Sequence, residues 1–155
     1  HHKDFFKFMV FNTLFGGYFG SRLMKNIREE KGLTYGINSS LVPLADSGYW
    51  NIGTDVNKEN VSKAIDEINV EIEKMKHEVV TDEELQLVKN YMKGSILNST
   101  NTVFDIMDKH KAMIHENLEK DFYDNMLGKI DGVSVKDIIE MANVYMIDIS
   151  SAVVG

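Results

Sequence analysis

Residues 14–37 read LFGGYFGSRLMKNIREEKGLTYGI, and this stretch decides how the chain around it folds. Its glycines at 16, 17 and 20 interrupt an apolar segment, and the next residue, Ser21, can cap a helix from Arg22 to Lys31. Gly32 suits the position just after a helix, because glycine adopts the left-handed conformation easily. From residue 33 to 41 apolar and polar residues alternate, and this period of two predicts a half-buried strand.

The segment before the glycines, residues 4–15, is mostly apolar and contains neither Gly nor Pro. We predict a buried helix there, and a strand is the alternative for so aromatic a run. On the other side of the motif, residues 43–48 contain the only proline and predict a turn. Residues 49–56 alternate again, so we expect a second strand that is antiparallel to the first.

Further along the chain the pattern changes to the three-and-four spacing that is typical of amphipathic helices. One such helix is expected over residues 61–75, and Thr81 with Glu84 predicts a capping box for another that ends near Asn98. Residues 151–154 predict a final strand. The other expected helices follow Thr102 as far as about Asn117, lie near Met126, and follow Ser134.

These elements predict an α+β fold, a two-layer sandwich in which helices cover one face of an antiparallel sheet. Three strands make a thin sheet for so many helices, so we expect a further, first strand upstream of residue 4 to belong to the fold. Residues 1–2 are both histidine and are interpreted as a tag remnant. Residues 3–155 then have the length of a single domain.

Composition excludes several classes of function. The chain carries 17 Lys plus Arg against 24 Asp plus Glu, a formal net charge of −7. This balance argues against binding to nucleic acid or to an anionic membrane surface, because both require basic patches. No apolar run approaches the ~20 residues of a transmembrane helix. Cysteine is absent, which excludes disulfides, thiolate metal ligands and a cysteine nucleophile.

The histidines outside the tag do not form a recognisable metal site. His110 and His115 share an expected helix, but a spacing of five places them about 140° apart around it. Their spacing matches neither of the zinc-peptidase motifs His-Glu-x-x-His and His-x-x-Glu-His. We therefore interpret these two histidines and His77 as solvated side chains. The glycine-rich loop is not a phosphate loop either, because it follows a helix and lacks a Lys-Ser/Thr pair.

A more specific signal comes from the order of motifs around the glycines. The chain has Asn12 near the end of a helix, then Gly16-Gly17, then Ser21-Arg22-Leu23, and finally Arg28-Glu29-Glu30-Lys31-Gly32-Leu33-Thr34-Tyr35. This order resembles the C-terminal, non-catalytic domain of the insulinase, pitrilysin and mitochondrial processing peptidase family. The resemblance continues more loosely to the closing Ser-Ala-Val-Val-Gly and so covers nearly the whole chain.

The resemblance implies a metallopeptidase half-domain. In that family two related α+β halves close around an unfolded peptide, and the N-terminal half holds zinc through His-x-x-Glu-His and a downstream Glu. The C-terminal half holds no metal but contributes an Arg and a Tyr, seven residues apart, near the zinc. Arg28 and Tyr35 match that pair. The expected cofactor is therefore zinc in a partner half, on the same polypeptide or a separate subunit, with none in this domain.

The residue types suit these roles. Arg28 could hold a peptide carbonyl or carboxylate with its permanently charged donor fork. Tyr35 could donate its hydroxyl to a developing oxyanion, while the peptide adds along a sheet edge. Two alternatives stay open: Arg28 could serve the carbonyls at the end of its own helix, and Tyr35 could be a core residue in phase with Ile37. Arg22 is expected to be structural and to need a partner, because a cation at a helix start opposes the dipole.

Three functions remain in competition. The leading one is the substrate-binding, non-catalytic half of a zinc metalloendopeptidase, inactive alone. The second is a structural or assembly subunit that uses the peptidase fold without proteolysis, and the third is an unrelated ferredoxin-like binding module. The 9 Met and 8 Phe predict an apolar docking patch, which could also make the isolated chain a homodimer. The sequence does not identify the cell compartment, and a bacterial cytoplasm or periplasm is the expectation.

Overall fold

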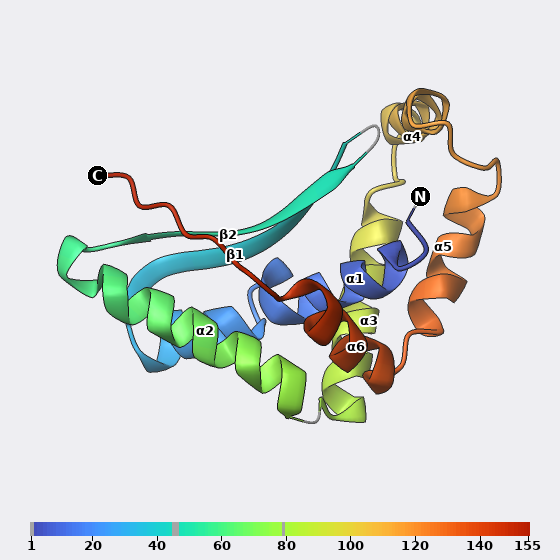
Figure 1. Cartoon of the computed structure of the whole chain (residues 1–155). Coiled ribbons are helices and arrows are strands. Elements are labelled where there is room, and N and C mark those ends of the chain that lie inside the picture. Colours follow the sequence, from blue (N-terminus) through green and yellow to red (C-terminus); the bar gives the residue numbers. More distant parts are fainter. Residues whose placement is uncertain (1, 45–46, 79) are drawn as a thin grey trace.

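The computed structural model describes residues 2–44, 47–78 and 80–155. In this part of the chain a two-stranded antiparallel hairpin packs on a layer of helices, so the predicted α+β class with helices on one face of the sheet is confirmed (Figure 1). The elements in chain order are α1 (Phe5–Asn12), η1 (Thr13–Gly17), η2 (Met24–Glu30), β1 (Thr34–Pro43), β2 (Gly48–Val56), η3 (Lys58–Asn60), α2 (Val61–His77), α3 (Asp82–Asn98), α4 (Val103–His115), α5 (Phe122–Asp131) and α6 (Val135–Tyr145).

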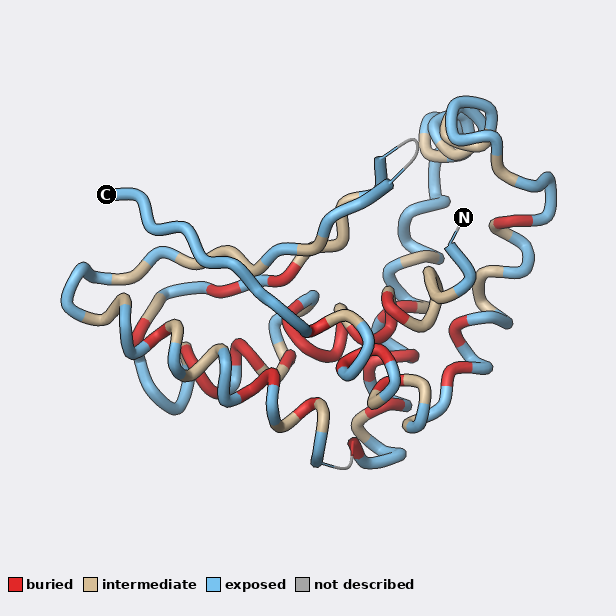
Figure 2. The backbone as a smooth tube through the Cα atoms, viewed as in Figure 1, coloured by how far each residue is buried: buried red, intermediate tan, exposed pale blue. Residues whose placement is uncertain are grey.

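The apolar segment at the N-terminus is the central helix of the molecule. Phe11 and Phe15 are completely buried and stack with their ring centroids 5.7 Å apart. Helix α1 contacts α5, α6 and β1, and Figure 2 shows buried residues gathered along it and along the facing sides of α2 and α6. The predicted helix over residues 4–15 is therefore confirmed, and the strand alternative is wrong.

The helix does not stop at Gly16, as the glycine cluster predicts, but continues through the wide turns of η1 to Gly17. Gly16 lies where the helical layer meets the hairpin, and a Cβ there would lie 2.6 Å from the Ser39 hydroxyl and 2.8 Å from its backbone nitrogen. The missing side chain allows β1 to approach the helix. Asn12 joins the same layers, because its Oδ1 accepts a hydrogen bond from Trp50 Nε1 at 2.7 Å.

The second predicted helix also forms and ends where expected. Gly32 has a φ of +62°, the left-handed value that terminates the helix. Ser21, however, does not cap it with its side chain. The Ser21 hydroxyl is buried and has no hydrogen-bond partner in the described part of the chain, while its carbonyl accepts the Lys25 N–H at 3.0 Å.

The hairpin confirms both predicted long strands and their antiparallel pairing. Its register runs regularly from Ile37 opposite Thr54 to Pro43 opposite Gly48, with Ile37 and Ser39 buried against the helices. Near its start the register shifts, because Thr34 pairs with Val56. From Thr34 to Ile37 β1 advances three residues, while β2 covers only two, from Val56 to Thr54. The extra residue defines a β-bulge at residues 35 and 36 of β1.

Of the other predicted helical caps, all but one form as the sequence predicts. Thr102 and Ser134 form complete capping boxes for α4 and α6. At α3 the Thr81 hydroxyl accepts the Glu84 N–H at 3.1 Å, but the Glu84 carboxylate pairs with Arg22 instead of returning to Thr81. The predicted capping box is therefore only half formed, since a charged partner outcompetes a backbone N–H for the carboxylate.

The predicted final strand is wrong. Residues 151–155 are extended and exposed and belong to neither strand of the sheet. A strand requires a neighbouring strand to supply hydrogen bonds, and β1 and β2 pair only with each other among the described residues. The sheet therefore has two strands in the described part of the chain. No described helix is long and apolar enough to cross a membrane.

Candidate functional site

Arg28 lies in the last turn of η2, and the backbone around it is firmly held. The wide turns of this helix direct the Lys31 N–H to the Asn26 carbonyl at 2.9 Å and the Leu33 N–H to the Ile27 carbonyl at 3.0 Å. Ile27 is completely buried. The adjacent Asn26 side chain donates to Glu71 on α2 at 2.8 Å. Arg28 thus extends from a fixed helix end toward the surface, half-buried itself.

The Arg28 guanidinium packs on an aromatic ring. Its Cζ lies 4.7 Å from the ring centroid of Phe19, a cation–π arrangement. Within residues 2–44, 47–78 and 80–155 this guanidinium forms no ion pair and no hydrogen bond. In particular, it does not bind the carbonyls at the end of its own helix. The in-plane N–H groups are therefore available to an acceptor from outside the described chain.

Tyr35 lies at the bulge in β1 and is 99% exposed. Strict alternation would place it on the same face as buried Ile37, but the extra residue in the bulge reverses its direction. Tyr35 is therefore not a core residue. Its phenol has no hydrogen-bond partner in the part of the chain that the structure describes.

A small hydroxyl network holds the bulge that exposes Tyr35. The Thr34 hydroxyl donates to the Asp55 carbonyl at 2.6 Å and accepts the Gly36 N–H at 3.1 Å. The Thr54 hydroxyl, from the neighbouring strand, donates to the Gly36 carbonyl at 3.0 Å. These bonds satisfy backbone groups that the irregular register would otherwise leave unpaired, so the bulge is a defined feature of the hairpin.

The structure places Arg28 and Tyr35 on either side of the short helix-to-strand connection at residues 31–33. Among the described residues no hydrogen bond or ring contact joins the two side chains, and each reaches the surface separately. The arrangement offers two donors of different kinds, a cationic fork and a neutral phenol, on one short stretch of backbone.

The other arginine has a different environment. Arg22 donates from Nε and Nη2 to the two oxygens of Glu84, at 2.9 and 2.8 Å. The hydrogen bonds to Glu84 raise the pKa of Arg22 above its usual range, although burial opposes them. The expectation that Arg22 is structural and finds a partner is confirmed, and the partner is Glu84 on α3.

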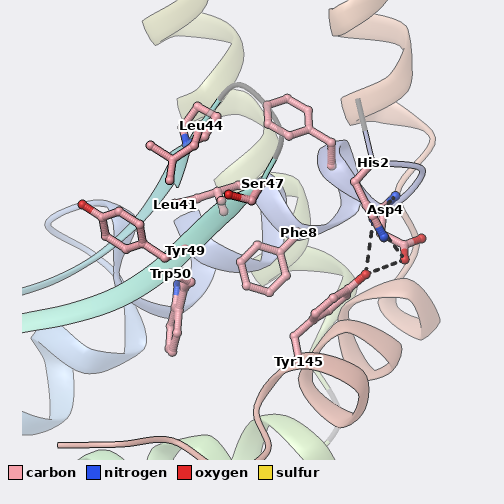
Figure 3. A pocket seen from close by; sticks show the side chains of 12 residues that line it. His2, Asp4, Phe8, Leu41, Leu44, Ser47, Tyr49, Trp50 and Tyr145 are labelled. Carbon is pink, nitrogen blue, oxygen red and sulfur yellow. Dashed lines mark hydrogen bonds and ion pairs between the residues drawn. The ribbon is translucent and has the colours of Figure 1, made fainter.

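One pocket lies away from both predicted site residues. It has a volume of about 540 Å³ and opens between the hairpin, α1 and α6 (Figure 3). Its walls are mainly apolar, with the Phe8 ring between those of Trp50 and Tyr145, and Tyr145 lies beside Asp4. The Tyr145 hydroxyl donates to Asp4 Oδ2 at 2.8 Å, and burial together with this bond raises the pKa of Tyr145 to about 12. At neutral pH this tyrosine is therefore a neutral hydrogen-bond donor.

The described residues contain no group of three His, Cys, Asp or Glu side chains that could hold a metal ion. His77 and His115 are largely exposed, and each pairs with a glutamate of its own helical segment, Glu73 at 3.5 Å and Glu116 at 3.0 Å. These histidines are solvated, as the sequence predicts.

Sequence reasoning missed three of these features. It treated Phe19 only as part of a glycine-rich loop, and it did not foresee that Glu84 would leave its cap for Arg22. It also gave no role to Tyr145. No local pattern marks Phe19 as exposed, because a phenylalanine in a glycine-rich turn can equally pack against the core. The other two depend on contacts between residues far apart in the sequence.

Comparison with known proteins gives consistent results. The family model described as "Peptidase M16 inactive domain" matches residues 1–92. The chain is 30% identical over 149 residues to the uncharacterized zinc protease YmxG of Bacillus subtilis, covering 91% of this chain and 34% of the relative. It is 28% identical over 159 residues to the non-peptidase homolog YmxG of Helicobacter pylori, covering 99% of this chain and 36% of that protein.

A solved structure agrees as well. The crystal structure of the peptidase M16 inactive domain from Pseudomonas fluorescens superimposes with a TM-score of 0.82 at 26% sequence identity. The match covers 91% of this chain and 34% of that one. The chain thus spans about a third of the length of the proteins that it resembles.

Proposed function

The chain belongs to the peptidase M16 inactive-domain family, and from that premise we propose that it is the substrate-binding, non-catalytic half of a zinc metalloendopeptidase. In this proposal it binds unfolded peptide next to a zinc ion that the other half holds. The observation that carries the proposal is the bulge at the start of β1, which leaves the Tyr35 phenol almost wholly exposed and without a partner among the described residues.

The two predicted site residues have separate tasks. Arg28 binds a carbonyl or carboxylate of the peptide through the N–H edge of its guanidinium, which no described residue occupies. Tyr35 donates its hydroxyl to the scissile carbonyl as that oxygen becomes an oxyanion. A neutral phenol suits this role because it can donate a proton in a hydrogen bond without carrying a competing charge.

The partner is a zinc-bearing half with a His-x-x-Glu-His motif, on the same polypeptide or on a separate subunit. Two observations support a partner of this kind. The chain covers 34% of the length of the zinc protease YmxG, and its described residues offer no three-ligand cluster for a metal. Zinc held by the other half would supply polarisation of the peptide carbonyl and activation of a water molecule. The residues of this chain then position the peptide and stabilise the charge that develops.

The peptide itself adds along an edge of the hairpin. In a two-stranded sheet each strand has one edge free of the other, and main-chain hydrogen bonds to such an edge bind extended peptides with little sequence selection. This mode suits an unfolded substrate, whose backbone hydrogen-bonding groups are all available.

The test uses the full protein, in which this domain and the zinc-bearing half are together. Cleavage of an unstructured, internally quenched peptide is measured for wild type, Arg28→Ala, Tyr35→Phe and the control Tyr49→Phe. Tyr49 is an exposed tyrosine on β2, and the proposal gives its hydroxyl no role. We expect Tyr35→Phe to lower kcat/KM by about 10²-fold, as for loss of one oxyanion donor, and Tyr49→Phe to leave it unchanged.

The alternative is a structural or assembly subunit that uses the fold without proteolysis. A specific observation favours keeping it, since one relative is named a non-peptidase homolog. The same variants discriminate between the two. Lost cleavage with intact association of the halves, judged by size-exclusion chromatography, supports the peptidase role. Unchanged cleavage in both Arg28→Ala and Tyr35→Phe overturns the role given to the pair, and absence of cleavage in wild type favours the assembly role.

A further inference from the structure

We propose that Phe19 is a positioning residue for substrate, which acts by holding the Arg28 guanidinium in the orientation that receives a peptide carbonyl or carboxylate. This inference rests on the proposed function and adds a residue to it. The observation behind it is the 4.7 Å separation between Arg28 Cζ and the centre of the Phe19 ring.

Phe19 is not placed on the surface by chance. It occupies the corner of a tight turn that is closed by a hydrogen bond from the Ser21 N–H to the Tyr18 carbonyl at 3.1 Å. The Tyr18 ring anchors that turn to α3, because its centroid lies 4.8 Å from that of Tyr91. A Cβ on Gly20 would lie 2.8 Å from the Tyr18 ring, so this position accepts only glycine without rearrangement. The Phe19 ring is therefore carried by a fixed backbone.

Core packing does not explain this ring. Phe19 remains 65% exposed, and the guanidinium of Arg28 packs against its face. Exposing a phenylalanine costs free energy that a polar residue at the corner of a turn would avoid. The position is explained if the ring serves the cation beside it.

The contact with Phe19 leaves the N–H donors of Arg28 free. A guanidinium is a flat group whose N–H bonds all lie in its plane, and a ring packed on its face leaves these donors uncovered. Arg22 shows the contrast, since Glu84 occupies its donor edge from two sides. In the described chain no acceptor occupies the edge of Arg28.

The benefit of the contact is preorganisation. A free arginine side chain has many rotamers and loses them on binding, which lowers affinity for the ligand. Packing on Phe19 removes part of this freedom before the peptide arrives. The contact also partly desolvates the cation and so strengthens its attraction for a carboxylate or a carbonyl.

The test again uses the full protein with its zinc-bearing half. Two quantities are measured for each variant: kcat and KM with the quenched peptide, and the Kd for a fluorescein-labelled unstructured peptide by fluorescence anisotropy. The variants are Phe19→Leu, Phe19→Trp, Arg28→Ala and Phe19→Leu with Arg28→Ala. Phe104→Leu is the matched control, because Phe104 is a similarly exposed phenylalanine on α4.

We expect Phe19→Leu to raise KM and Kd about two- to fivefold with kcat nearly unchanged, the size of an exposed cation–π contact. Phe19→Trp should keep KM and Kd at wild-type values, since indole also binds cations on its face. In the Arg28→Ala background Phe19→Leu should have no further effect. Phe104→Leu should behave as wild type.

Three results would overturn the inference. If Phe19→Leu binds and cleaves as wild type while Arg28→Ala is impaired, the role of Phe19 is wrong and the proposed function stands. If Phe19→Leu has the same effect with and without Arg28, Phe19 acts independently of it. If Arg28→Ala itself changes nothing, the proposed function fails together with this inference.

Discussion

The guanidinium of Arg22 and the carboxylate of Glu84 form a two-point ion pair, with nitrogen–oxygen distances of 2.9 and 2.8 Å, between residues 62 positions apart in the sequence. The pair joins the start of the helix over residues 22–30, here called the motif helix, to the first turn of α3. Both side chains are mostly shielded from solvent. Glu84 also lies at the N-terminal end of α3, where a negative charge is favoured. The Glu84 carboxylate thus stabilises both helices, the first through its ion pair with Arg22 and α3 through its position at the helix start.

Removing Arg22 should therefore destabilise the fold. We expect Arg22→Met to lower the free energy of unfolding by about 2–3 kcal/mol, because it leaves the shielded Glu84 charge without its partner. Urea denaturation followed by circular dichroism measures this. Adding Glu84→Gln to the variant should recover part of the loss. As a comparison, Lys93→Met breaks the more exposed pair with Asp131 and should change stability little.

Gly16 should tolerate no side chain. In Gly16→Ala the new Cβ would lie 2.6 Å from the Ser39 hydroxyl and 2.9 Å from Leu23 Cδ1, so β1 or the motif helix must shift. We expect a loss of about 1–3 kcal/mol, the usual cost of overpacking a core, measured by thermal or urea unfolding.

Gly94 provides the matched control for this substitution. It lies within α3, and nothing is within 4 Å of a Cβ built on it. Gly94→Ala should stabilise the protein by about 0.5–1 kcal/mol through helix propensity. Equal effects at the two glycines would contradict the close approach of hairpin and helix at Gly16.

Asp137 should make the protein sensitive to acid. Burial raises the pKa of this carboxyl, but hydrogen bonds from Lys7 and from Ser134 outweigh it and lower the pKa to about 2. The charged form is therefore stabilised by folding, and the contribution is complete above the unfolded pKa near 4. It is lost as the pH falls from about 4 to about 2.

The corresponding measurement is the stability of wild type and Asp137→Asn as a function of pH. Near neutral pH we expect Asp137→Asn to be less stable by about 1–2 kcal/mol, less than the full shift implies because 20% of the Asp137 side chain is exposed. The two proteins should converge as the pH falls to about 2. Asp66→Asn, on the exposed side of α2, is the control, and an equal effect there would exclude a special role for Asp137.

Thr34 should control the direction of Tyr35. Thr34→Val removes the hydroxyl that accepts the Gly36 N–H and donates to the Asp55 carbonyl, so the bulge loses its support. If Tyr35 acts on substrate, kcat/KM of the full protein should fall toward that of Tyr35→Phe while the hairpin still forms. Asn51→Ala, an exposed position on β2, should leave cleavage unchanged. Full activity in Thr34→Val would show that the bulge does not position Tyr35.

The sequence alone determined the order and extent of most elements. The apolar run of α1, the alternating hairpin strands and the capping residues Thr102 and Ser134 are local signals, and each acts through its own neighbours in the chain. The left-handed Gly32 that ends the motif helix is local in the same sense. The family motif from Asn12 to Tyr35 is likewise contained in one stretch, so the order of its residues is enough to identify it.

Only the tertiary structure decided which side chains are available to other molecules. Periodicity placed Tyr35 with Ile37, but one extra residue in the register turns it outward. The capping pattern predicts that the Glu84 carboxylate accepts the Thr81 N–H, but in the fold this carboxylate binds Arg22. The segment 151–154 has the composition of a strand and forms none, since pairing requires a neighbour that composition cannot supply. Register, ion pairing and strand pairing depend on distances between segments remote in sequence, and those distances exist only in the folded chain.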